Sequence, residues 1–292
     1  MRIFLTGATG FVGSHILPLL VEAGHHVLGL SRSEAGANQL AAAGAEVHRG
    51  DLEDPSTLRS GAERADAVIH CAFDHDFSRF VANCEKDRRN IEAIGAALAG
   101  SKRPFVITSG TGLGSRTPGA LATEDYFDAA NPNPRKISEQ TGDALRDVNV
   151  SYVRLPQVHD TRKQGLITPL IEIYRANGRV AYVGDGKRRF AAAHVTDAAR
   201  VFKLAVERGE PGARYHAVAE EGVAMREIAE ALGRALRLPV TSIPATEAAG
   251  FFGWMAMFAD LDYPASSEVT RHKLNWTPTG PSLLADLEHL AT

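Results

Sequence analysis

The sequence predicts an α/β protein built on a doubly wound parallel sheet, followed by a smaller, mainly helical C-terminal lobe. Strand-like apolar runs alternate with helical patterns through the first half of the chain. The first run ends abruptly in a turn that holds three regularly spaced glycines, and beyond Pro156 the pattern changes to shorter helices. We therefore expect a sheet domain over residues 1–160 and a substrate-binding lobe over residues 161–292.

Strand-like runs set the rhythm of the first domain, at residues 2–6, 26–31, 45–48, 67–71, 104–108 and 150–154. Helical patterns fall between them, near residues 11–23, 36–43, 84–99 and 135–147. Strands that alternate with helices in this way form parallel sheets through right-handed crossovers. The alternation therefore predicts the sheet and its two helical faces.

The second half of the chain departs from this rhythm. Residues 110–134 are rich in Gly, Pro, Asn and Thr, and a loop of this length in a compact domain is usually functional. Further on, helical patterns are short, at residues 167–175, 224–236, 245–259 and 282–290. Residues 214–218 have the pattern of a seventh strand, so segments near 190–220 are expected to return to the sheet and interleave the two parts.

The turn after residues 2–6 has the spacing of a dinucleotide-binding loop. Gly7 allows a tight exit from the strand, Gly10 lets a pyrophosphate approach the backbone, and Gly13 allows close packing of helix on sheet. The N-terminus of the following helix supplies free N–H groups and partial positive charge. The contacts expected from this loop are Gly7, Thr9, Gly10, Phe11, Val12 and Gly13.

This GxxGxxG spacing, preceded by Thr6, resembles the short-chain dehydrogenase/reductase superfamily, particularly its extended and atypical, epimerase/dehydratase-like branches. The resemblance continues in the segments 48–52, 67–72, 105–109, 153–156 and 193–199. It implies a Rossmann-type sheet that binds a nicotinamide dinucleotide. The further cofactor contacts that it implies are Ser31, Arg32, Asp51, Leu52, Cys71, Ala72, Phe73, Asn90, Thr108, Pro156 and Val158.

The end of the second strand favours NADP(H) over NAD(H). A protein that binds the free ribose 2′-hydroxyl usually has Asp or Glu here, because a carboxylate accepts that proton and repels a phosphate. This chain has Ser31 and Arg32 instead, with no acid before Glu34. A guanidinium can pair with a 2′-phosphate and stack on adenine.

Reductases of this superfamily use a tyrosine as proton donor and a lysine four residues later, but this chain has no Tyr-x-x-x-Lys. The superfamily has a glutamate four residues beyond the lysine, and Glu139 fits it. That register puts Arg135 at the lysine position and Asn131 at the tyrosine position. A shift by one puts Lys136 at the lysine position but Pro132 at the tyrosine position, so the pair is still absent.

Other side chains are therefore candidates for the chemistry. Ser109 or Thr111, after the fifth strand, is expected to bond the substrate carbonyl, although either could simply cap the strand end. Arg135 could keep the electrostatic role of the lysine, but it cannot titrate near neutrality. Tyr126 in the irregular loop is the candidate phenol, with a loop anchor as the alternative.

Composition excludes several classes of function. A hydrophobic content of 44%, a charged content of 23% and a net charge of −3 indicate no nucleic acid or membrane partner. Cys71 and Cys84 are too few for a disulfide scaffold, and with the first strand starting directly after Met1 we expect a reduced, cytoplasmic protein. The histidines lack metal-ligand spacing, so no metal is expected.

Two further groups of residues have mainly structural interpretations. His194 and Asp197 precede and begin a helix, where an acid suits the first turn. The aromatic stretch around Trp254 is expected to form core or a dimer face, with a wall of the substrate pocket as the alternative.

The sequence thus predicts an NADP(H)-dependent oxidoreductase that acts on a small or medium-sized carbonyl or alcohol, with a homodimer left open. A nucleotide-sugar epimerase or dehydratase is one alternative, although that chemistry depends on the missing tyrosine. A non-catalytic NADP(H)-binding redox sensor is the other, and the absent Tyr-Lys pair favours it.

Overall fold

The computed structural model describes residues 1–259 and 261–291, and its core is a parallel sheet. In the described residues this sheet has seven strands, in the order β10 (Arg214–His216), β6 (Asn149–Leu155), β5 (Pro104–Gly110), β4 (Ala67–His70), β1 (Arg2–Thr6), β2 (His26–Ser31) and β3 (Glu46–Arg49). Every neighbouring pair in it is parallel. The reversal of strand order beside β1 makes the sheet doubly wound, as predicted.

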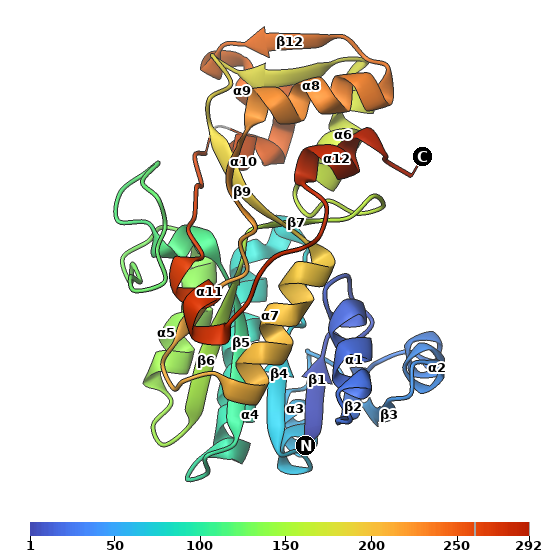
Figure 1. Cartoon of the computed structure of the whole chain (residues 1–292), viewed down its shortest axis with the longest axis vertical. Coiled ribbons are helices and arrows are strands. Elements are labelled where there is room, and N and C mark those ends of the chain that lie inside the picture. Colours follow the sequence, from blue (N-terminus) through green and yellow to red (C-terminus); the bar gives the residue numbers. More distant parts are fainter. Residues whose placement is uncertain (260, 292) are drawn as a thin grey trace.

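Helices cover both faces of the sheet (Figure 1). One face carries α1 (Gly13–Glu22), α2 (Glu34–Ala42) and α7 (Val195–Arg208), and the other carries α3 (Pro55–Glu63), α4 (Phe80–Leu98) and α5 (Ile137–Ala144). Alternate strand residues feed the two cores: Ile3 and Leu5 join the first, whereas Phe4 joins the second. Burial on both faces explains why the strands are nearly continuous apolar runs.

The expected helices differ from the observed ones at their starts. α1 begins at Gly13 rather than at residue 11, and a 3₁₀ turn, η3 (Pro134–Lys136), precedes α5. The sequence prediction omitted α3 altogether, although Asp54 caps it and Pro55 occupies its first turn. Both are helix-start signals that can be recognised in the sequence.

The C-terminal lobe lies above the carboxyl ends of the strands (Figure 1). Its helices are α6 (Ile167–Asn177), α8 (Met225–Leu236), α9 (Ala245–Phe252), α10 (Ala256–Ala259) and α12 (Leu283–Glu288). The lobe also contains strands that the sequence prediction missed: β8 (Val180–Val183) pairs with β12 (Val240–Ile243), and β9 (Arg189–His194) lies between β7 (Gln157–His159) and β11 (Glu220–Ala224). These strands are short and their partners are distant in sequence, so periodicity does not reveal them.

The last part of the chain returns to the sheet domain. Helix α11 (Glu268–Leu274) lies beside β10, where the Thr270 hydroxyl accepts a hydrogen bond from the His216 N–H at 2.7 Å. Asp197, fully buried in the first turn of α7, accepts the backbone N–H groups of Thr279 at 3.0 Å and Gly280 at 2.8 Å. This carboxylate therefore ties the C-terminal segment to the sheet domain.

We expect Asp197→Ala to lower the free energy of unfolding by about 2–3 kcal/mol, because two backbone N–H groups would lose the buried charged acceptor that binds them. Urea denaturation measures the change. Asp185→Ala is the control, because the Asp185 side chain is 65% exposed. Equal stability of the two variants would contradict the structural role of Asp197.

Candidate functional site

A cleft of about 1130 Å³ lies between the carboxyl ends of the sheet strands and the C-terminal lobe. Ligands bind at this edge in open parallel sheets, where the strand order reverses. The predicted cofactor contacts that line the cleft are Gly7, Thr9, Gly10, Phe11, Val12, Gly13, Ser31, Arg32, Asp51, Leu52, Cys71, Ala72, Phe73, Thr108, Pro156 and Val158.

The glycine-rich turn forms a tight backbone cradle at the floor of the cleft. Gly7 has a φ of +69°, and a Cβ there would lie 2.8 Å from the Ala72 nitrogen. A Cβ on Gly13 would lie only 2.0 Å from the Gly7 oxygen, so helix α1 packs against the turn as closely as glycine permits. A Cβ on Gly10 would meet nothing within 4 Å except the Gly7 oxygen at 3.1 Å. The cradle therefore fits a pyrophosphate that needs close approach to the backbone.

The guanidinium group of Arg32 lies at the far end of the cleft, directly after β2. Arg32 is exposed and has no ion-pair or hydrogen-bond partner within residues 1–259 and 261–291. Beside it the Ser31 hydroxyl donates to the Ser33 carbonyl at 3.0 Å, and Ser33 caps helix α2. An unpaired guanidinium beside a helix N-terminus is suited to bind a phosphate.

A chain of buried polar groups runs from the first strand to the middle of the cleft. The Thr6 hydroxyl lies 2.8 Å from His70 Nδ1 and accepts the N–H of Cys71 at 3.1 Å. His70 Nε2 lies 3.0 Å from Asp87 Oδ1, and Asp87 in turn pairs with Arg135. This chain connects the ends of β1 and β4 to α4 and η3.

Arg135 is thereby fixed as a permanent cation at the cleft wall. Its guanidinium donates to the Thr108 carbonyl at 3.1 Å and lies 4.1 Å from the centre of the Phe73 ring. Burial by itself would raise the pKa of Asp87, but the charge of Arg135 and the bond to His70 outweigh it and hold that pKa far below its usual range. The pair is therefore ionised at any ordinary pH.

The two predicted hydroxyl groups, those of Ser109 and Thr111, differ in their hydrogen bonds within the described residues. Ser109 Oγ donates to Glu139 Oε1 at 2.6 Å, and Arg154 holds the same carboxylate through two bonds of 2.7 and 2.8 Å. The Thr111 hydroxyl lines the cleft and has no hydrogen-bond partner among the residues that the structure describes. Thr111 is therefore the hydroxyl that can donate to a substrate oxygen.

Two predicted site residues do not line the cleft. The Tyr126 ring lies beneath Arg116, whose guanidinium carbon is 4.4 Å from its centre, and the Tyr126 carbonyl accepts from Arg154 at 2.9 Å. Asn90 is buried on α4 and donates to the Leu52 carbonyl at 3.2 Å. Tyr126 thus corresponds to the loop-anchor alternative, and Asn90 supports the turn that lines the cleft instead of lining it.

Sequence reasoning missed a tyrosine that the fold brings to the cleft. Tyr263 lines it, and a Cβ on Gly112 would lie 3.2 Å from the Tyr263 ring, so the ring packs against Gly112, the residue after Thr111. Its backbone bridges to Phe190 of β9, and burial raises the pKa of its phenol. Because that pairing joins segments far apart in sequence, no local motif marks this tyrosine.

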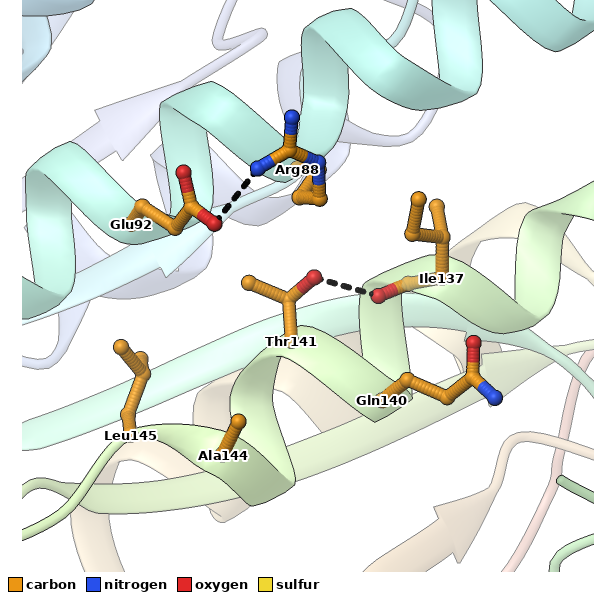
Figure 2. A pocket seen from close by; sticks show the side chains of 7 residues that line it. All are labelled: Arg88, Glu92, Ile137, Gln140, Thr141, Ala144 and Leu145. Carbon is orange, nitrogen blue, oxygen red and sulfur yellow. Dashed lines mark hydrogen bonds and ion pairs between the residues drawn. The ribbon is translucent and has the colours of Figure 1, made fainter.

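A second hollow, of about 440 Å³, lies between α4 and α5 (Figure 2). Its polar groups are already paired: Arg88 donates to Glu92 at 2.7 Å, and the Thr141 hydroxyl donates to the Ile137 carbonyl at 2.6 Å. The polar groups of this hollow are satisfied within the protein, so it is a weaker candidate for a ligand site than the cleft. Across residues 1–259 and 261–291 no cluster of His, Cys, Asp and Glu could hold a metal, and no helix is long and apolar enough to cross a membrane.

Comparisons with known proteins show the family and the fold of this chain. The model of a family described as NAD(P)H-binding matches residues 7–168. The "Uncharacterized protein C2A9.02" of Schizosaccharomyces pombe is 44% identical over 290 residues, which are 98% of each chain. The 2-alkyl-3-oxoalkanoate reductase of Stenotrophomonas maltophilia is 29% identical over 82% of this chain and 77% of its own. A solved structure, the human epimerase family protein SDR39U1 with NADPH, shares the fold with a TM-score of 0.75 at 18% identity, covering 99% of both chains.

We expect Asp87→Asn to destabilise the protein by about 3 kcal/mol at neutral pH, because it breaks a buried ion pair. The pKa of Asp87 is lower in the folded than in the unfolded protein. The stabilisation by ionised Asp87 is therefore fully present above about pH 4, the pKa of an aspartate in the unfolded protein. It is lost progressively as the pH falls below that value. The Tm difference between wild type and variant should narrow on acidification.

The control is Glu92→Gln on the same helix, which removes one partner of an exposed pair. Such surface pairs contribute less than about 1 kcal/mol. A Tm difference for Asp87→Asn that stays constant from neutral pH to about pH 3 would contradict the buried ion pair.

Proposed function

The chain belongs to the NAD(P)H-binding family, and from that premise we propose that it is an NADP(H)-dependent oxidoreductase that interconverts a carbonyl compound and an alcohol. One observation carries the proposal. A single cleft combines the backbone cradle at Gly10, the fixed cation Arg135 and the hydroxyls of Thr111 and Tyr263, neither of which has a hydrogen-bond partner among the described residues. These are the groups that hydride transfer to a carbonyl requires.

The dinucleotide would be held by two separate groups of residues in the cleft. The N–H groups of the turn at Gly10 and the N-terminus of α1 would bind its pyrophosphate. Arg32, with Ser31 beside it, would bind the 2′-phosphate that distinguishes NADP(H) from NAD(H). The carboxylate of Asp51 lines the same end, where the adenine is expected.

Bound there, the nicotinamide ring would supply or accept the hydride. Thr111 Oγ1 would donate a hydrogen bond to the substrate oxygen, and the Tyr263 phenol would hold the proton that this oxygen needs. A raised pKa keeps that phenol protonated at neutral pH. Arg135 adds positive charge near the oxygen but cannot exchange a proton itself.

The same residues argue against epimerase chemistry, which needs a tyrosine base with a lowered pKa. Burial raises the pKa of Tyr263 instead, and no lysine lies four residues after it. The named relative that reduces a 3-oxo group, at 29% identity, further supports a reductase. A purely cofactor-binding protein is the remaining alternative and is an outcome of the tests below.

We expect Arg32→Ala to weaken NADPH binding about 10-fold or more and to leave NADH binding nearly unchanged, because only NADPH has the 2′-phosphate. Titration of intrinsic fluorescence with each cofactor measures both constants. Arg49→Ala is the matched control, since Arg49 is exposed at the end of the neighbouring strand but pairs with Glu34. Equal affinity of the wild type for both cofactors would contradict the NADP(H) assignment.

We expect Tyr263→Phe to lower kcat roughly 100-fold, as loss of a general acid does, while NADPH binding is unchanged. Tyr126→Phe is the matched control and should change kcat by less than about threefold, because its ring lies outside the cleft lining. Steady-state reduction of a ketone panel by NADPH provides the rates. Tight NADPH binding by the wild type without turnover of any carbonyl would favour a binding protein over a reductase.

A further inference from the structure

The outer part of the cleft is walled by aromatic rings. Phe77 and Phe80 come from the segment after β4, and Trp254 and Phe258 come from η4 (Gly253–Met255) and α10 of the lobe. Tyr263 lines the same cleft, with its ring against Gly112, the residue after Thr111. We call these five residues the aromatic arm.

Four of the five rings, those of Phe77, Phe80, Trp254 and Phe258, form a contact cluster across the two parts of the protein. Phe77 stacks on Trp254 with centroids 5.2 Å apart and planes 18° from parallel. Phe77 also meets Phe258 at 5.9 Å and Phe80 at 5.5 Å, with tilted or edge-on geometry. Trp254 nonetheless remains 49% exposed, an unusual state for the largest apolar side chain. The arm is therefore a preformed wall with ring surface still open to a ligand.

The titratable group nearest the arm is His75, which lines the cleft with its ring 6.2 Å from that of Phe77. Burial and the nearby charges of Arg135 and Lys163 lower the pKa of His75, which favours its neutral form. Lys86 is paired with Glu53 and Asp74, and Arg135 is paired with Asp87. The ammonium group of Lys163 lies 5.5 Å from the Phe11 ring, at the glycine-rich turn. The arm itself contributes one phenol and otherwise only hydrocarbon rings and an indole. A diphosphate that lies against these rings would thus lose its hydration without gaining a cationic partner from the arm itself.

We infer that the substrate is an apolar carbonyl compound with a flat ring system, bound with its ring in the aromatic arm and its oxygen at Thr111 and Tyr263. The carbonyl part of this inference rests on the proposed function, whereas the ring part rests on the arm alone. Aromatic side chains favour flat apolar ligands through offset stacking and edge contacts. A nucleotide-sugar substrate is correspondingly disfavoured against these rings.

The experiment measures binding without turnover, so that it does not depend on catalysis. Protein saturated with NADP⁺ cannot reduce a ketone, and it is titrated with 2-acetylnaphthalene, with 2-dodecanone of equal carbon number and with UDP-glucose. Trp254 fluorescence reports occupancy, because Trp276 is only 3% exposed and bonds the Asp197 carbonyl. Calorimetry gives the same constants independently of the reporter.

We expect 2-acetylnaphthalene to bind at least about 5-fold more tightly than 2-dodecanone, and UDP-glucose not to bind at millimolar concentration. Phe77→Ala and Trp254→Ala should each weaken the naphthyl ketone about 5-fold or more, while NADPH affinity stays unchanged. Trp254→Phe should keep the calorimetric affinity and lose most of the fluorescence change. Val81→Ala is the control, because Val81 is 64% exposed near these rings and does not line the cleft.

Equal affinity for the two ketones, binding of UDP-glucose, or wild-type affinity for the naphthyl ketone in Phe77→Ala would each overturn the inference. Failure of the proposed function gives a different result, namely no binding of NADPH to the wild-type protein. In that event the titration without cofactor still tests the arm. In that titration, tight binding of 2-acetylnaphthalene to the wild type and weaker binding to Phe77→Ala would support the ring-binding role of the aromatic arm.

Discussion

The buried ion pair between Asp87 and Arg135 is the interaction on which the candidate site depends. A carboxylate only 3% exposed carries a large desolvation cost unless a cation accompanies it. Arg135 provides that cation, and through His70 and Thr6 the same carboxylate is connected to the first strand and its glycine-rich turn. One ion pair therefore orients the cation of the cleft and ties it to the cofactor cradle.

The distribution of charge divides the cleft into two chemical environments. Arg32 and the N–H groups at Gly10 lie at one end, where anionic phosphates would be neutralised. The aromatic arm lies at the other, with Phe77 and Trp254 contributed by different parts of the chain. Arg135 and Thr111 line the same cleft and supply polar groups, as does the phenol of Tyr263 in the arm. Under the proposed function, the cofactor would bind among the cationic and N–H groups and the substrate against the rings.

Much of the fold follows from local patterns that the sequence displays. The alternation of runs predicts the parallel sheet, and residues 214–218 supply its seventh strand, observed as β10. The glycine spacing predicts the tight turn, because a Cβ on Gly13 has no room beside the Gly7 oxygen. Helix α3 can also be predicted from local signals, because Asp54 and Pro55 mark its start. Such features depend on neighbours within a few residues and can therefore be predicted without the tertiary structure.

The sequence by itself determined the doubly wound fold, the nucleotide cradle and the absence of the usual Tyr-Lys pair. Only the tertiary structure decided which tyrosine reaches the cleft: Tyr126 is held beneath Arg116, whereas Tyr263 arrives through a bridge to Phe190. It also decided that Ser109 is committed to Glu139 while Thr111 is free. The physical reason is the range of the interactions. Glycine conformation and hydrophobic period act along the chain, but hydrogen-bond partners and ring contacts form between distant segments after folding.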